Sequence, residues 1–269
     1  MSLQQGADTL LPNPATGGCS RSTVQWTAGA GAGTPCETDS RPNDATSLSS
    51  DFPIATDLHL LGPMSARLWV GSVGGRDALV TARAEDVAPD GTTTQMSAGW
   101  DVISLRALDP QKTVYANRLM TQPYHPFTQA SVLPVPSDGS PVEVDVEIYP
   151  TGWTLPAGHK LRLTLQSADE PHLTASLPTG LNSAGATLSI YHDASHDSEL
   201  VIPVRGAGAG APSAALTVSQ IKSGAKPKPK KPKHHKKKHR PACRIVHHGH
   251  KKHRVCPRKH KPITKRHPH

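Results

Sequence analysis

The sequence has 269 residues, of which 35% are hydrophobic and 4% aromatic, and a formal net charge of +9 at pH 7. It contains no run of about 18 apolar residues, which excludes a membrane-spanning helix. Met1 is followed by a polar, glycine-rich segment without the basic and apolar regions of a signal peptide. We expect either a cytosolic chain or one whose true N-terminus lies further upstream, and the cysteines favour the second.

The positive net charge comes from the C-terminal part of the chain. Residues 1–205 hold all 21 acidic and 11 of the 30 basic residues, a net charge of −10, whereas residues 206–269 hold 19 basic residues and no acid. Such a separation of charge affects which charged partners each part attracts, and it does not indicate a particular fold. The sequence therefore predicts an acidic body joined to a cationic tail.

Residues 1–50 form the first of three predicted regions, an irregular segment. They are rich in Gly, Ala, Ser, Thr and Pro and show no sustained hydrophobic period. Within them, Cys19 and Cys36 enclose a glycine-rich loop. A disulfide there would contribute about 3 kcal/mol through the chain entropy of the unfolded state. We expect this disulfide, with two unrelated free thiols as the alternative.

Residues 51–205, the second region, are expected to form short strands. The clearest is residues 142–149, where four β-branched residues alternate with three acids, as in a half-buried antiparallel strand. Residues 161–165 alternate leucine with polar residues in the same way. The other predicted strands are residues 57–61, 66–71, 78–87, 187–191 and 200–204.

Turn sequences separate these strands. They are Pro89-Asp90-Gly91, Ser137-Asp138-Gly139 and Pro156-Ala157-Gly158. No window of about 12 residues has the period of an amphipathic helix. Many short strands with regular turns and no helices predict an all-β sandwich.

Residues 206–269, the third region, begin with a glycine-rich linker and continue as a basic tail. Its Lys-Pro repeats and Lys/His/Arg clusters cannot bury enough apolar surface to offset chain entropy, so we expect disorder. The tail would bind an anionic polymer or surface through counterion release, with a solvated tail that has no partner as the alternative. The residues expected to bind polyanions are Lys228, Lys230, Lys231, Lys236, Lys237, Lys238, Arg240, Lys251, Lys252 and Arg254.

Cys243 and Cys256 lie in the tail and bracket several histidines. Structural zinc sites usually pair Cys and His ligands about two to five residues apart. The segment between these cysteines fits that spacing poorly, so we expect no structural metal site and no cofactor. In an oxidising compartment, a second disulfide between Cys243 and Cys256 is expected instead.

Several blocks in residues 51–205 occur in an order that resembles one protein family. Three of them are ATDLHLLGP at residues 55–63, QPYHPF at 122–127 and AGHKLRL at 157–163. Together with the others, they resemble the C-terminal domain of the X-Pro dipeptidyl-peptidase and cocaine-esterase (CocE/NonD) type hydrolases. The other blocks are residues 66–70, 83–91, 99–106, 149–151, 191–193 and 200–204.

The resemblance implies a jelly roll of the galactose-binding-like kind that packs on an α/β-hydrolase domain and shapes its substrate pocket. It also implies that the catalytic Ser, Asp and His lie in that other domain, so no catalytic residue is carried over to this chain. Family members cleave peptide, ester or amide bonds, and the parent protein is expected to be secreted. One departure is Asp169-Glu170-Pro171, where the family usually has an aromatic residue between Asp and Pro.

The residues themselves also argue against catalysis. The sequence contains no Gly-x-Ser-x-Gly, the nucleophile motif of α/β hydrolases. Residues 192–198 combine His, Asp and Ser, but catalytic triads are normally assembled from distant segments, so we expect a turn with capping side chains. His125 and His159 are likewise expected to serve packing or turns rather than ligand binding.

Three functions follow as hypotheses. The leading one is the accessory domain of a serine hydrolase, inactive alone, whose partner is an α/β-hydrolase domain outside this chain. The second is a stand-alone secreted module that binds carbohydrate or polyanions and is anchored by its basic tail. The third is an esterase or peptidase with an unrecognised site.

Overall fold

The computed structural model of the chain describes residues 6–11, 28–29, 33, 38–44, 47–75, 77–169 and 185–205, and the backbone of residues 215–217, 244–248 and 251–255. The chain divides into two compact units, Met1–Ala225 and Lys226–His269, and each is described by itself. In the described part, no helix is long and apolar enough to cross a membrane.

The first sheet of the Met1–Ala225 unit is organised around β3. This strand pairs with β8 along one edge, and β10 and β11 share its other edge. Outside them, β1 pairs with β10 and β12 with β11, and every pairing is antiparallel. The six strands are β1 (Ala7–Leu10), β3 (Leu58–Val73), β8 (Val142–Leu155), β10 (Thr187–Tyr191), β11 (Glu199–Val201) and β12 (Ala215–Thr217).

The second sheet has the strand order β2-β9-β4-β5, again with antiparallel pairing throughout. A separate hairpin follows β5 in the chain and turns through Asn117 and Arg118, both with positive φ, as a tight hairpin requires. The four strands of the sheet are β2 (Leu48–Pro53), β4 (Leu79–Val87), β5 (Thr93–Val102) and β9 (Lys160–Gln166). The hairpin consists of β6 (Val114–Ala116) and β7 (Leu119–Gln122).

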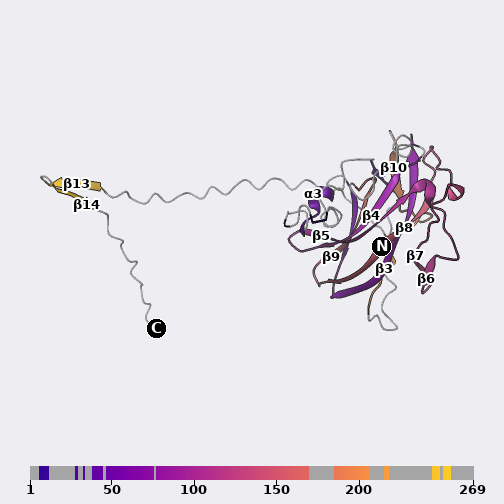
Figure 1. Ribbon diagram of the computed structural model, residues 1–269, viewed down its shortest axis with the longest axis horizontal. Coiled ribbons are helices and arrows are strands. Elements are labelled where there is room, and N and C mark those ends of the chain that lie inside the picture. Colours follow the sequence, from indigo (N-terminus) through magenta and orange to yellow (C-terminus); the bar gives the residue numbers. More distant parts are fainter. Residues whose placement is uncertain are drawn as a thin grey trace, which may run out of the picture. The chain divides into compact units, whose positions relative to one another are not determined.

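The hydrophobic core lies between the two sheets (Figure 1). From the first sheet, Val144 and Val146 of β8 point inward, and from the second, Leu163 and Leu165 of β9 do so. Alternate residues of a strand lie on opposite faces, so these runs bury one face of each sheet against the other. The described helical turns are only three or four residues long: α3 (Arg41–Asp44), η1 (Ile103–Leu105) and η2 (Gln129–Ser131). The predicted all-β sandwich is confirmed.

The strand predictions differ from the structure mainly in continuity. Residues 57–61 and 66–71, predicted as two strands, fall in one strand, β3, whose register shifts between Gly62 and Met64. The predicted turns are confirmed, because their glycines have positive φ values that suit glycine, 88° for Gly91, 88° for Gly139 and 86° for Gly158. The strands that the sequence did not indicate are β1, β2, β5, β6, β7 and β12 and, in the tail, β13 (Arg244–His248) and β14 (Lys251–Val255).

The N-terminal segment, expected to be irregular, contributes to the sandwich. β1 and β2 belong to the two sheets, and residues 38–44 lie over the outer face of the second sheet. There the Ser40 hydroxyl donates to Glu85 at 2.9 Å, and Arg83 donates to Asp44 at 2.5 Å. Every residue of β4 is therefore buried, including the charged ones on its outer face.

In the Lys226–His269 unit, the structure describes one antiparallel hairpin. It consists of β13 (Arg244–His248) and β14 (Lys251–Val255), joined by the two residues Gly249 and His250. The expected disorder of the tail stays a prediction. All four cysteines, and the side chains of the ten residues expected to bind polyanions, lie outside what the structure describes.

Candidate functional site

The candidate site is a cavity of about 280 Å³ on the side of the sandwich where β5 meets β8. Trp100 of β5 and Glu147 and Tyr149 of β8 line it, together with the loop 123–127 that follows β7. Four aromatic side chains and one carboxylate thus come together from segments far apart in the sequence. The loop contributes Pro123, Tyr124, His125, Pro126 and Phe127.

Gly99 lets β5 approach β8 at the base of this cavity. A Cβ atom at this position would lie only 1.7 Å from the Glu147 carbonyl oxygen, so no other residue fits without moving the strands apart. Next to it, the Ser97 hydroxyl donates to the Tyr149 carbonyl oxygen at 2.6 Å. Because of this close approach, Trp100 of one sheet lies beside Tyr149 of the other.

The aromatic rings are held in defined positions. The Trp100 and Tyr149 rings are in edge contact, with centroids 5.6 Å apart and planes at 63°. The Trp100 indole N–H donates to the Asp169 carboxylate at 2.7 Å, which fixes the ring in its plane. Three of the lining side chains are partly exposed, by 55% for Tyr149, 42% for Tyr124 and 57% for Phe127. A ligand or partner can therefore reach part of each ring.

His125 anchors the loop 123–127 to the sandwich. Its ring is buried, with Nε2 2.8 Å from the Asp145 carbonyl oxygen and Nδ1 3.2 Å from that of Ala107. The Asp101 carboxylate lies 3.7 Å from Nε2. Both ring nitrogens are thus engaged inside the protein, and the predicted packing role of His125 is confirmed.

Three acids follow one another on the outer face of β8. Glu143 and Asp145 both pair with Arg67, at 3.1 and 3.2 Å. The Glu147 carboxylate has no ion pair or hydrogen bond with any residue that the structure describes. By the alternation of a strand, its side chain lies on the same face as Tyr149 and therefore beside the cavity.

Burial shifts the titration of the acids under this site. It raises the pKa of Asp101 to about 6, opposed by the nearby His125, and the pKa of Asp145 to about 6, opposed by Arg67. In both cases, removal of the carboxylate from water is the dominant cause. The ion pairs of these residues hold the loop and strand in place.

The histidine-rich segment 192–198 forms the predicted turn. The Asp193 carboxylate accepts hydrogen bonds from the backbone N–H groups of Ser195 and His196 and contacts His196 Nδ1 at 3.1 Å. The Ser198 hydroxyl donates to the Tyr191 carbonyl oxygen and accepts from the backbone of Trp69. These groups cap backbone atoms, as expected.

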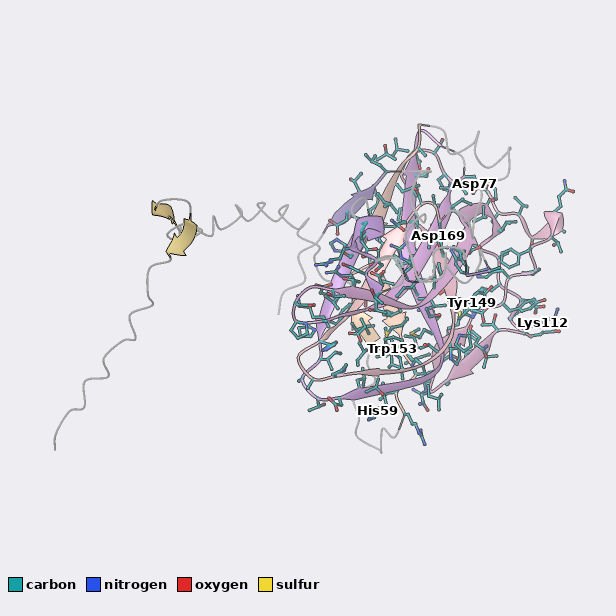
Figure 2. The ribbon with its side chains drawn as sticks, turned by 60° about the vertical axis from the view of Figure 1, so that its left-hand side comes forward. His59, Asp77, Lys112, Tyr149, Trp153 and Asp169 are labelled. Carbon is teal, nitrogen blue, oxygen red and sulfur yellow. The ribbon has the colours of Figure 1, made fainter. Side chains whose placement is uncertain are left out.

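His159 forms a second small network at another end of the sandwich. Its Nδ1 lies 2.7 Å from one oxygen of Asp86, whose other oxygen accepts from the Trp153 indole N–H at 3.0 Å. Figure 2 shows Trp153 and His59 away from Tyr149. The structure gives His159 a hydrogen-bonding role beside Asp86, and the expectation that it binds no ligand stays a prediction.

Sequence reasoning did not single out the aromatic residues of the cavity. Trp100, Tyr124 and Tyr149 each lie in a block that carried the family resemblance, which was their only signal. Their convergence depends on the approach of β5 to β8, and no local pattern encodes it.

Comparison with known proteins gives a consistent result. The model of the family described as X-Pro dipeptidyl-peptidase C-terminal non-catalytic domain matches residues 3–201. A curated protein of Mycobacterium bovis, named "Putative serine esterase Mb1866c", is 26% identical over 200 residues, which cover 74% of this chain. The match spans only 30% of that relative's own length.

Two solved structures share the fold. An α-amino acid ester hydrolase superposes with a TM-score of 0.51 at 16% identity. The superposition covers 76% of this chain and 33% of the hydrolase chain. An aminopeptidase from a marine sediment archaeon, Thaumarchaeota archaeon, superposes with a TM-score of 0.50 at 18% identity. This superposition covers 76% of this chain and 34% of the aminopeptidase chain. Because the family model matches well over half of the residues, the chain belongs to the family of X-Pro dipeptidyl-peptidase C-terminal non-catalytic domains.

Proposed function

We propose that this chain is the accessory domain of a secreted serine hydrolase that cleaves peptide, ester or amide bonds. The observation that carries the proposal is the match of residues 3–201 to a domain described as non-catalytic. The relative named as a serine esterase supports it, since this chain corresponds to only 30% of that protein. The nucleophile would belong to an α/β-hydrolase domain, and this chain would shape the edge of its substrate pocket.

The surface available for such a partner is concentrated in one segment. Of the ten exposed large hydrophobic side chains in the described part, six lie in residues 114–133. Apolar surface of this kind on a soluble domain usually marks an interaction site. We infer that the part of this segment outside the cavity, namely Val114, Tyr115, Val132 and Leu133, contacts the catalytic domain. The six residues are Val114, Tyr115, Tyr124, Phe127, Val132 and Leu133.

A first experiment identifies the partner. The DNA upstream of the Met1 codon is sequenced, and the same frame and its neighbours are searched for an α/β-hydrolase domain with a Gly-x-Ser-x-Gly motif. We expect such a coding sequence, intact or split. If the region encodes no hydrolase, the proposed catalytic domain is missing and the result contradicts the proposal.

A second experiment tests the contact segment. The chain is co-expressed with the hydrolase domain found upstream, and co-purification is compared between the wild type and the variants Tyr115→Ser and Leu133→Ser. The control is Leu61→Ser, which removes a side chain of β3 that is 60% exposed, more than Tyr115 or Leu133. We expect co-purification to fall for the first two only. Equal recovery of all three variants would place the contact elsewhere.

A further inference from the structure

The cavity at β5 and β8 has the chemistry of a cation site. Its lining contains the rings of Trp100, Tyr124, Phe127 and Tyr149 and one carboxylate, Glu147, but neither Lys nor Arg. Aromatic faces carry the negative part of the ring quadrupole and attract cations. His125 also lines the cavity, yet its nitrogens contact backbone oxygens and Asp101 lies 3.7 Å away.

Glu147 is the acid on β8 that remains available to a ligand. The two acids before it on the same face, Glu143 and Asp145, both form ion pairs with Arg67. No described cation reaches Glu147, and its carboxylate lies beside the Tyr149 ring on the outer face of the strand. A carboxylate next to open aromatic rings attracts a positive charge more strongly than the rings do alone.

One ring of this site already binds an ammonium group within the chain. Lys112 Nζ lies 4.6 Å from the centroid of the Tyr124 ring, although Lys112 is not among the lining residues of the cavity. We propose that the cavity formed by Trp100, Tyr124, Phe127, Tyr149 and Glu147 binds an organic ammonium group, with Glu147 as its counter-ion. The proposal concerns this chain alone and does not rest on the hydrolase partner.

The backbone at Phe127 supports a binding role. Its φ of 49° is in the left-handed region, which is rare for a bulky residue and costs energy. The strain does not bury the ring, which is 57% exposed. Such strain concentrates at binding sites, where it holds a side chain ready for a ligand.

The size of the cavity limits the ligand to a small head group. A volume of about 280 Å³ is near the lower end for ligand pockets and suits a quaternary amine or the end of a lysine side chain. A quaternary ammonium relies on the ring faces, whereas a primary ammonium also donates hydrogen bonds to Glu147. Binding experiments can therefore distinguish a quaternary ammonium ligand from a primary one.

The test is a titration of the full chain, labelled with nitrogen-15, followed by NMR at constant ionic strength. The probes are choline, its neutral isostere 3,3-dimethyl-1-butanol, and Nα-acetyl-lysine methylamide. We expect saturable shifts of the Trp100 indole N–H signal with one or both ammonium probes and none with the isostere. Equal shifts with choline and the isostere, or no saturable shift with either amine, would overturn the proposal.

Variants locate the site. Glu147→Gln keeps the shape of the side chain and should weaken binding by about tenfold, the loss expected when a cation loses its counter-ion at a partly exposed aromatic site. Tyr149→Leu should weaken it similarly. The matched control is Glu143→Gln, which changes another acid on the same face of β8. This variant should bind the probe as the wild type does. If Glu147→Gln, folded as judged by its spectrum, binds with unchanged affinity, the assignment is wrong.

Discussion

Arg83 of β4 donates a hydrogen bond of 2.5 Å to the carboxylate of Asp44, which lies 39 residues earlier in the helical turn α3. The Arg83 side chain is completely buried, and it also contacts Glu85 and Gln166. This interaction fastens the N-terminal segment over the outer face of the second sheet. The burial of these charged side chains on the outer face of the sheet therefore depends on residues that precede the predicted strand region.

Removal of Arg83 should destabilise the fold strongly. Arg83→Met leaves Asp44 and Glu85 buried without their counter-ion, which typically costs about 3–5 kcal/mol. Urea denaturation measures this change. In the control Arg41→Met, a surface ion pair with Asp39 is lost, and the change should stay below about 1 kcal/mol. Equal effects of the two substitutions would contradict the buried network.

The stability of the fold should decrease as the pH rises from about 4 to about 7. Burial, and next the negative charge of Glu85, raise the pKa of Asp44 from 3.8 to about 7. In this window the folded state keeps a proton that the unfolded state has released, so each step upward in pH favours unfolding. Denaturation midpoints measured across this range provide the test.

Asp44→Asn should reduce this decline, because the amide does not titrate. Part of the decline should remain, because burial also raises the pKa values of Asp101 and Asp145 to about 6. Asp39→Asn is the control, since the pKa of Asp39 is lowered, first by its hydrogen bond with Arg41, and its contribution is lost only at low pH. A slope between pH 4 and 7 that is the same in Asp44→Asn and in the wild type would refute the assignment.

The close approach of β5 and β8 depends on Gly99. Gly99→Ala places a Cβ atom against the Glu147 carbonyl oxygen, so the strands must separate, at a cost of about 1–3 kcal/mol or more. Thermal unfolding should reveal this loss. Gly152→Ala, in β8 with its nearest neighbour at 3.7 Å, should have little effect. An unaffected Gly99→Ala would mean that the cavity is not built as described.

Replacement of Phe127 by Asn should be neutral or stabilise the fold by up to about 1 kcal/mol, because Asn tolerates the left-handed region better. Phe127 is mostly exposed, so little burial is lost. Tyr115→Asn, a similarly exposed ring in a strand, should gain nothing. Chemical denaturation compares the two, and a clear loss for Phe127→Asn would show that the ring contributes to packing.

The sequence patterns predicted the strands that bury one face and expose the other. Apolar and polar residues alternate so regularly in β8 and β9 that this period of two was sufficient to predict both strands. β5 was not predicted, because its polar sequence becomes buried only through its pairing with β4 and its approach to β8 at Gly99. Arg83 and Glu85 likewise gave no sign of burial, since the segment that covers them lies about 40 residues away.

The candidate site was less predictable than the fold. Its aromatic residues come from two sheets and a loop, and they meet only after the sandwich has closed. By contrast, the turn at residues 192–198 was predictable, because Asp193 caps backbone groups two and three residues further along the chain.

The non-catalytic role of this chain is tested most directly with a fluorophosphonate probe that labels activated serines. The purified chain and its complex with the proposed α/β-hydrolase domain are both treated, and labelled peptides are identified by mass spectrometry. We predict a labelled serine in the hydrolase domain and none in residues 1–269. A labelled serine within this chain, with ester hydrolysis by the chain alone, would contradict the assignment.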